Sequence, residues 1–538
     1  MMAGDTGNVA ALVGRHAELH PHRLALLAAG VDEPVSFGEL WERSGRFAGA
    51  LAEAGIAKGD RLLVMVPMSI DLYVVLLGII RSGAVAVFVD PWAGAAKMAA
   101  FSIFAEPAGY VGVRRSHWLR LLHRPLRRIP LTVVTDSKRP FPVARYSLHR
   151  LLVEHDPAGP PAQTAADDPA LITFTTGSSG VPKGANRTHG FLTAQYQALK
   201  QTFPLEQADV DMTSFPVFAL RNLADGIPTA IPPVDLRCIE AADPPAVAEF
   251  AMASGVTTCT ASPPLVDALA AGLAELPGAA APRRILTGGG PVTNEQLRRW
   301  RAAFPESQID IVYGSTEAEP VAHLSLEDRL ALEGTRPGIC VGRPVDGVRT
   351  RLLAISRRPI PEPVDEGEWA VPPGVPGELL VAGDHVCRDY FRNPDAVREN
   401  KVRDSDGAVW HRMGDTGMFD EDGRFWLTGR VHTTVFRDGV PLQAQLVESA
   451  AAEALPEAER IALVGLPSEK HGEEAVLVVQ DCARRLTGAQ AEQAVRSSQL
   501  PVDRVVLWRR ELPLDPRHRT KIEYPELRRA LAGTRRNQ

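Results

Sequence analysis

Residues 171–184 read LITFTTGSSGVPKG, an apolar run followed by a loop of hydroxyl side chains and glycines. Hydroxyls and backbone N–H groups in such a loop can surround phosphate oxygens, and glycine permits their close approach. Lys183, just beyond the loop, can add a point charge for the same anion. No GK[ST] sequence closes the loop, so it is not a Walker loop, and taken alone it could be a solvated turn. The loop residues that we expect to contact phosphate are Thr175, Thr176, Gly177, Ser178, Ser179 and Gly180.

Further motifs follow this loop in a fixed order. They are GGGPV at 288–292, YGSTE at 313–317, GELLVAGDHVCRDY at 377–390, WHRMGDTG at 410–417, LTGRVHTTV at 427–435 and PLDPRHRTKI at 513–522. Together with the loop, the set resembles the adenylate-forming superfamily of acyl-CoA synthetases, luciferases and peptide-synthetase adenylation domains, and it covers nearly the whole chain. The resemblance implies ATP-dependent activation of a carboxylic acid as its acyl-AMP, with loss of pyrophosphate.

The resemblance also implies a role for each nucleotide-binding residue. The 175–180 loop and Lys183 would hold the β- and γ-phosphates, and Asp415 would accept both ribose hydroxyls, a task that suits a carboxylate with two acceptor oxygens. Arg430 would lie near the ribose or the phosphates. The adenine and α-phosphate would be contacted by Gly289, Gly290, Pro291, Tyr313, Gly314, Ser315 and Thr316. For His189, after the loop, a role in the nucleotide site and a role in capping or packing a helix both stay open.

Three catalytic residues are implied by the same resemblance: Lys521, Glu317 and Lys183. Glu317 would bind Mg²⁺, a hard cation that prefers oxygen ligands. Lys521 would bridge the substrate carboxylate and the α-phosphate, and stabilise the charge that develops during transfer. His432 stands at the hinge position, where the family usually has Asp or Lys, so the pivot is expected within a few residues of it.

Several strings resemble one branch of the superfamily, the bacterial β-lactone synthetases of olefin biosynthesis. They are AVFVDP near 85–91, THGFLTAQYQAL at 188–199, FPVFAL at 215–220, YGSTEAEPVA at 313–322 and DPRHRTKI at 515–522. That branch implies a fatty or 3-hydroxy fatty acid whose own hydroxyl displaces AMP. An acyl-CoA or acyl-carrier ligase is the alternative, with coenzyme A as acceptor, although Ala219 replaces a histidine common in acyl-CoA synthetases. A non-catalytic nucleotide-binding protein is the third hypothesis.

The elements needed to position these residues indicate an α/β fold. Helical periodicity over 38–55 and 72–81 alternates with short apolar strands, which predicts parallel sheets with ligands beyond the carboxyl ends of the strands. After Arg430 the pattern changes to strands mixed with helices. We therefore expect a large N-terminal α/β domain with stacked sheets at 1–431, and a small mobile α+β domain at 432–538 that carries Lys521.

Composition limits the partners. The 538 residues carry a net charge of −6, and the charge count indicates no basic block and hence no nucleic-acid partner. Five scattered cysteines without a CxxC pattern, no signal peptide and no transmembrane segment favour a cytoplasmic enzyme. The expected partner is a small carboxylic acid, with a carrier protein or pathway enzymes as further partners of the alternative hypotheses.

Overall fold

The computed structural model describes residues 7–30, 33–89, 94–139, 141–175, 183–276, 278–364, 366–514 and 522–535. The chain divides into two compact units. The first contains residues 1–330, 345–348 and 383–397, and the second contains residues 331–344, 349–382 and 398–538. Helices α13 (Leu326–Ala331) and α15 (Pro394–Asn400) each contain a position at which the chain passes between units.

The first unit contains a sheet with the strand order β7-β6-β5-β3-β4-β8-β9, parallel except for the β8–β9 hairpin. Its strands are β3 (Arg61–Met65), β4 (Val85–Val89), β5 (Gly109–Gly112), β6 (Leu131–Val134), β7 (Tyr146–Ser147), β8 (Pro169–Thr175) and β9 (Lys183–Thr188). The helices of this region are α2 (Phe37–Glu53), α3 (Ile70–Arg81), α4 (Gly94–Ala105), α5 (Arg114–Leu121), α6 (Arg124–Arg127) and α7 (Leu148–Glu154). Ser36 caps α2 through a reciprocal capping box with Glu39, which fixes where that helix begins.

A second group of strands in the same unit has the order β2-β1-β11-β10-β12-β13-β14-β15. The strands are β1 (Leu24–Ala28), β2 (Val35–Ser36), β10 (Asp211–Thr213), β11 (Thr229–Ile231), β12 (Thr258–Ala261), β13 (Arg284–Gly288), β14 (Gln308–Ser315) and β15 (Ala318–Ser325). Their helices are α1 (Ala11–Leu19), α8 (His189–Thr202), α9 (Pro216–Asp225), α10 (Pro244–Ala253), α11 (Pro263–Glu275) and α12 (Asn294–Ala303), with a short 3₁₀ helix at Ile239–Ala241.

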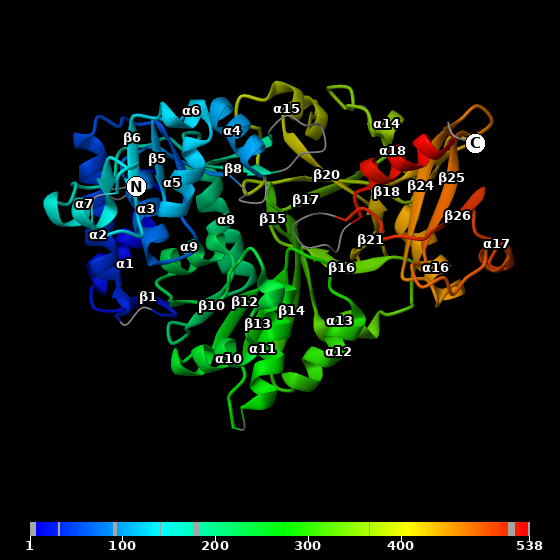
Figure 1. Ribbon diagram of the computed structural model, residues 1–538, viewed down its shortest axis with the longest axis horizontal. Coiled ribbons are helices and arrows are strands. Elements are labelled where there is room, and N and C mark those ends of the chain that lie inside the picture. Colours follow the sequence, from blue (N-terminus) through cyan, green and yellow to red (C-terminus); the bar gives the residue numbers. More distant parts are fainter. Residues whose placement is uncertain are drawn as a thin grey trace. The chain divides into compact units, whose positions relative to one another are not determined.

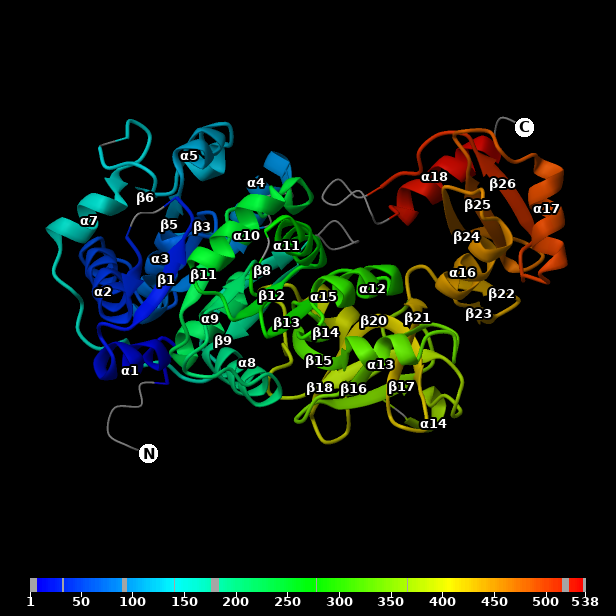
Figure 2. The ribbon, with the colours of Figure 1, turned by 90° about the horizontal axis from the view of Figure 1, so that it is seen from below.

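Helices separate and cover these two sheets. One core cluster joins α2, α3 and α9 with strands of both sheets, so these helices form the middle layer. A second cluster packs α4 and α6 on the opposite face of the first sheet. A third packs α10, α11 and α12 on the outer face of the second sheet, where Figure 2 shows the green helices lying over the strands. The stacked α/β arrangement predicted for the larger part of the chain is therefore confirmed (Figure 1).

The second unit contains an antiparallel sheet in the order β17-β18-β20-β21-β16, with β19 paired to β20. These strands are β16 (Ile339–Pro344), β17 (Arg349–Leu353), β18 (Gly377–Ala382), β19 (Lys401–Arg403), β20 (Val409–Phe419) and β21 (Phe425–Arg430), with α14 (Glu366–Trp369) between β17 and β18. The remaining elements are β22 (Val435–Arg437), β23 (Val440–Leu442), α16 (Ala444–Ala454), β24 (Arg460–Ser468), β25 (Gly472–Gln480), α17 (Gly488–Ser497), β26 (Arg504–Trp508) and α18 (Tyr524–Arg535). Two core clusters, built from residues between 435 and 531, belong to this last group alone.

The 377–390 motif resembles a strand pair of the superfamily, and the structure departs from that resemblance. Only β18 forms, and residues 383–393 are irregular. Val386 and Tyr390 form isolated β-bridges to Ala318 and Ala185. These single bridges and side-chain contacts hold the segment in place of a regular strand ladder. The domain boundary after residue 431 stays a prediction. No helix in the described ranges combines the length and the apolar character needed to cross a bilayer.

Candidate active site

The phosphate loop predicted from the sequence connects the two strands of a hairpin. Thr175, the last residue of β8, pairs with Lys183, the first residue of β9. The loop therefore leaves and re-enters the sheet at one edge, with the half-buried Lys183 at its exit. Thr176, Gly177, Ser178, Ser179 and Gly180 lie outside the described residues, and so does the side chain of Thr175.

The predicted adenine turn follows β13 directly. In the parallel pairing of β13 with β14, Gly288 lies opposite Val312. A Cβ at Gly288 would stand 2.4 Å from the Val312 carbonyl oxygen, so the strands can meet there only at a glycine. Gly289 then adopts φ +73°, in the left-handed region that glycine tolerates, and begins the turn that continues through Gly290 and Pro291. The turn thus begins one residue after the Gly288–Val312 pair, next to Tyr313 on the neighbouring strand.

Tyr313, Gly314, Ser315, Thr316 and Glu317 form the end of β14 and the tight turn into β15, and all are half-buried. The register shifts between Tyr313 and Ser315, which marks a bulge in the hairpin. A Cβ at Gly314 would stand 2.7 Å from the Ala318 carbonyl oxygen, so this turn also requires glycine. Bulges re-aim side chains and are frequent beside active sites.

Glu317 is fixed by the irregular segment after β18. The Tyr390 hydroxyl donates to Glu317 Oε1 at 2.8 Å, and the Cys387 N–H donates to the Glu317 carbonyl at 2.7 Å. Burial raises the pKa of Tyr390, so its hydroxyl stays a donor. The sequence motifs assigned no role to Tyr390. Its place as the last residue of the 377–390 motif was the one sequence feature that could have pointed to it.

Arg187 links the two hairpins. This buried side chain of β9 donates from Nη2 to the Thr316 carbonyl at 2.8 Å. Beyond the turn, Gln195 of α8 donates to the Glu319 carbonyl at 3.0 Å. Burial raises the pKa of Glu319 to about 7, while the charge of Arg187 acts in the opposite direction. The phosphate hairpin, the adenine turn and the Tyr313–Glu317 hairpin are therefore held at one edge of the first unit.

In the second unit, Asp415 and Arg430 are cross-strand partners. Asp415 of β20 is buried and lies opposite Arg430 of β21, whose Nε is 3.0 Å from Asp415 Oδ1. Arg430 is mostly exposed. A Cβ at Gly417 would stand 2.2 Å from the Trp426 carbonyl oxygen. The two strands that carry the Asp415–Arg430 pair therefore approach closely at a glycine. The arrangement offers a buried carboxylate steadied by one arginine.

An ordered turn follows Arg430. Its carbonyl accepts hydrogen bonds from the backbone N–H and the hydroxyl of both Thr433 and Thr434. The carbonyl of His432 accepts from Arg528 Nη2 of α18 at 2.9 Å. Burial, followed by the charges of Arg430, Arg528 and Arg357, lowers the pKa of His432. Lys521 lies outside the described residues.

A comparison with protein families agrees with this geometry. Residues 13–391 match the family described as "AMP-binding enzyme". The chain belongs to the AMP-binding enzyme family. It is accordingly an AMP-forming acid ligase that uses ATP, and the resemblance inferred from its motifs is confirmed.

Two curated relatives carry the description "olefin beta-lactone synthetase". The enzyme of Xanthomonas campestris is 33% identical and covers 96% of this chain and 97% of its own length. The enzyme of Stenotrophomonas maltophilia is 32% identical, over 85% of each chain. Among solved structures, ATP-bound MatB from Rhodopseudomonas palustris superposes with a TM-score of 0.74 and 22% identity, over 97% of this chain and 98% of that one, a similarity of fold.

The surroundings of His189 and Ala219 in this AMP-binding enzyme indicate what these two residues do. His189, at the first position of α8, is buried and its Nδ1 accepts from the Val9 N–H at 3.1 Å, which favours packing. Burial lowers the pKa of His189 to about 4, so the ring is neutral near pH 7. Ala219 of α9 is fully buried in the core cluster that joins α2, α3 and α9.

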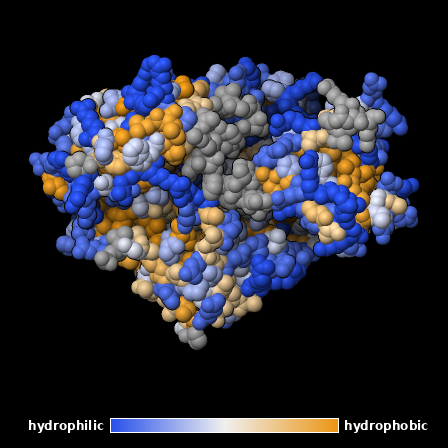
Figure 3. All heavy atoms as spheres, in the orientation of Figure 1, coloured by the Kyte–Doolittle hydropathy of each residue, from blue (hydrophilic) through white to orange (hydrophobic). Residues whose placement is uncertain are grey.

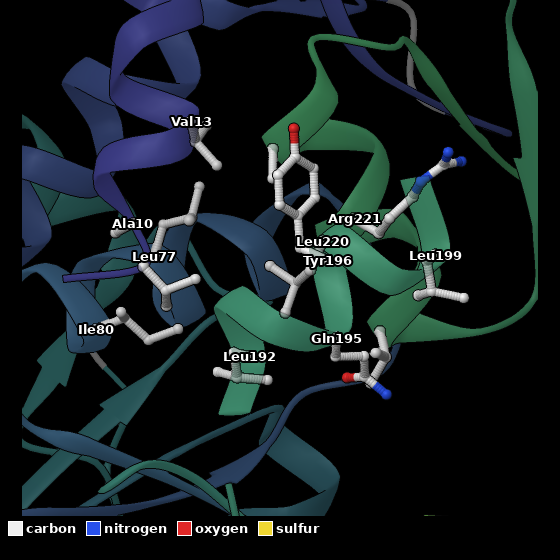
Figure 4. Close-up of a pocket in the computed structure, with 13 residues that line it drawn as sticks. Ala10, Val13, Leu77, Ile80, Leu192, Gln195, Tyr196, Leu199, Leu220 and Arg221 are labelled. Atoms are coloured by element: carbon white, nitrogen blue, oxygen red, sulfur yellow. The ribbon is translucent and has the colours of Figure 1, made fainter. Parts of the chain in front are cut away.

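An apolar pocket lies between α1, α3, α8 and α9 in the first unit (Figure 4). Its volume is about 40 Å³. A water needs about 10–15 Å³ of such space, so the pocket has room for a few water-sized groups. The lining includes Val13, Leu77, Ile80, Leu192, Tyr196 and Leu220.

Proposed function

We propose that this AMP-binding enzyme activates a 3-hydroxy fatty acid as its acyl-AMP and then closes the acid to a β-lactone. The observation that carries the proposal is the 33% identity to an olefin β-lactone synthetase over 96% of the chain. The fully buried Ala219, where acyl-CoA synthetases often have histidine, supports it.

In the first step, a carboxylate oxygen of the acid attacks the α-phosphorus of ATP, and the bond to pyrophosphate breaks. Two anions must meet, so the site has to neutralise charge and align the groups. Lys183 and the 175–180 loop would hold the β- and γ-phosphates, and Thr316 the α-phosphate. Tyr313 would stack on adenine against the 289–291 turn, while Asp415 accepts the ribose hydroxyls, with Arg430 beside them.

Mg²⁺ fits Glu317. A carboxylate is a hard oxygen donor, and Tyr390 orients it through one oxygen. Within the described part of the chain, no group of three His, Cys, Asp or Glu side chains gathers to form a protein cage. Mg²⁺ commonly binds one or two carboxylates together with substrate phosphates, and there it would neutralise phosphate charge.

Lys521 would complete the adenylation site. Placed on the 432–538 domain, its ammonium group would bridge the carboxylate and the α-phosphate once that domain closes on the 1–431 domain. The ordered turn after Arg430 is a reasonable pivot, because hinges are short element-terminal segments that absorb backbone change.

In the second step, the substrate's own 3-hydroxyl oxygen attacks the acyl carbonyl carbon. A C–O bond closes the four-membered ring, the bond from the carbonyl carbon to the AMP oxygen breaks, and the hydroxyl proton is released. The tether makes this attack intramolecular, so no second substrate has to bind. Water must be kept away from the mixed anhydride, since hydrolysis would compete.

Thioester formation is the alternative second step, with coenzyme A or a carrier protein as acceptor. Gly439, in the turn between β22 and β23, adopts φ +78°, and nothing lies within 4 Å of where its Cβ would be. Such an open turn could let a pantetheine arm pass.

Nucleotide release separates the hypotheses. The enzyme is incubated with ATP, Mg²⁺ and a 3-hydroxy fatty acid, with and without coenzyme A, and AMP is measured. We expect multiple turnovers of AMP without coenzyme A. AMP release that requires coenzyme A would favour the ligase, and no carboxylate-dependent pyrophosphate exchange with any acid would favour a non-catalytic protein.

A further inference from the structure

The segment from Arg114 to Arg128, which carries α5 and α6, is strongly basic. Residues 107–135 contain no Asp or Glu, although the whole chain has a net charge of −6. The expectation that no basic block exists is therefore wrong here. The exposed arginines of the segment are Arg114, Arg115, Arg124, Arg127 and Arg128.

The same segment exposes large apolar side chains. Trp118 is 56% exposed and Leu122 71% exposed, with Leu119 beside them at 37%. Ile103 of α4, a helix that contacts α6, is 57% exposed. In Figure 3, orange and blue spheres lie side by side over this region. Single exposed apolar residues are ordinary, but a cluster of them marks an interaction site.

The inner face of the segment already serves the fold. Leu126 is buried, and Arg120 donates to the Leu126 and Val143 carbonyls at 3.1 and 2.6 Å. The ring of His117 is buried and its Nε2 lies 3.0 Å from the Val133 carbonyl. These contacts fix α5 against β6. Arg114 also pairs with Asp136, and the Trp118 ring packs edge-on against Phe141. Both side chains nevertheless remain more than half exposed, so much of the outer face is left available to a partner.

We propose that this outer face, called here the α5–α6 face, docks on the surface of an anionic lipid bilayer. Arginines pair with lipid phosphates, while an indole and leucine side chains enter the boundary between headgroups and acyl chains. Nucleic acid or an acidic protein would satisfy the arginines, but neither needs the exposed leucines. Docking would place the enzyme where a long-chain acid and its apolar product partition, whichever acceptor the second step uses.

The attachment is reversible, because α5 has only eight residues and inserts few apolar groups. Attraction to the anionic surface falls with ionic strength, since the fields of exposed charges are screened within about 10 Å at 0.1 M salt. Each exposed arginine removed should weaken binding about fivefold.

Vesicle co-sedimentation tests the proposal with the full chain. The vesicles are phosphatidylcholine alone, or phosphatidylcholine with a third phosphatidylglycerol, at low and high salt. We expect binding to the anionic vesicles only, weakened by salt, and at least about tenfold weaker for Trp118→Ser/Leu122→Ser and for Arg124→Glu/Arg127→Glu. Met252→Ser and Arg496→Glu alter exposed apolar and basic residues elsewhere and should bind as wild type.

Pyrophosphate exchange and circular dichroism of each variant establish that it is folded. Since none of these residues belongs to the nucleotide site, exchange should be unchanged. Equal binding to neutral and anionic vesicles, or no binding by the wild type, would overturn the proposal. The variant Trp118→Ser/Leu122→Ser could bind anionic vesicles as tightly as wild type and bind duplex DNA equally well. That result would show a purely electrostatic surface and would reject lipid docking.

Discussion

The hydroxyl of Tyr390 donates a hydrogen bond to Oε1 of Glu317 over 2.8 Å, across 73 positions of sequence. It joins the irregular segment after β18 to the turn between β14 and β15. A carboxylate expected to bind a metal is thereby held in one orientation by a neighbour outside its own motif. Such outer partners of metal ligands influence affinity as well as geometry.

Replacing Tyr390 by phenylalanine should therefore raise the Mg²⁺ requirement. Loss of a hydrogen bond to a charged group costs about 1.5–3 kcal/mol, so we expect half-saturation by Mg²⁺ to move upward by roughly tenfold or more. The measurement is carboxylate-dependent pyrophosphate exchange titrated with Mg²⁺ at saturating ATP. Glu317→Gln should shift the same titration further.

Tyr110→Phe is the matched control, because the buried Tyr110 hydroxyl donates to the Ser116 carbonyl at 3.0 Å, away from the site. It should lower stability without moving the Mg²⁺ titration. Equal Mg²⁺ curves for Tyr390→Phe and wild type would argue that Glu317 is not a metal ligand.

Asp415→Ala should mainly weaken ATP binding. The carboxylate is buried and offers two acceptor oxygens for ribose hydroxyls, so its loss should raise the KM for ATP by at least about tenfold. Asp422, an exposed acid in the turn between β20 and β21, provides the control variant Asp422→Ala, which should leave the KM unchanged. An unchanged KM in Asp415→Ala would place the ribose elsewhere.

His189 should contribute to the loss of stability in acid. Burial lowers its pKa to about 4, whereas an unfolded imidazole has a pKa of about 6.5. Between these values the unfolded state binds more protons, so stability present above about pH 6.5 is lost as the pH falls to about 4, by about 3 kcal/mol.

The variant His189→Asn tests this linkage, since an amide oxygen can still accept from the Val9 N–H. Its free energy of unfolding should fall less steeply than that of wild type between about pH 7 and about pH 4.5, as measured by denaturant titration. Parallel pH curves for the two proteins would show that His189 is not the titrating group.

Lys521→Ala should keep ATP binding and lose adenylation. Removing one group that stabilises developing charge typically costs about 3–4 kcal/mol, or about 10²–10³ in rate. Equilibrium binding of ATP and pyrophosphate exchange measure the two properties separately. Exchange within about threefold of wild type would remove Lys521 from the mechanism.

The local elements were largely predictable from the sequence. Apolar runs ending in small residues located β13 and β14, and Gly289, with its positive φ, lies within the GGGPV motif that follows β13. The helix predicted over 38–55 corresponds to α2 (Phe37–Glu53). These features depend on short-range periodicity and on glycine conformations, which a single sequence records.

Contacts between distant segments were not predictable. Arg187 reaches the Thr316 carbonyl across 129 positions, and Asp415 meets Arg430 only through the register of two antiparallel strands. No local pattern encodes such a register. The net charge of −6 likewise averaged away the basic segment at 114–128, where exposure rather than composition revealed the α5–α6 face.

The product formed without coenzyme A tests the central claim most directly. The purified enzyme is incubated with ATP, Mg²⁺ and a 3-hydroxy fatty acid, and the organic extract is analysed by mass spectrometry, with Lys521→Ala and the matching acid lacking the hydroxyl as controls. We predict stoichiometric AMP and a product lighter than the acid by one water, absent from both controls. A product that appears only with added coenzyme A, and that is its thioester, would contradict β-lactone closure while leaving acid adenylation intact.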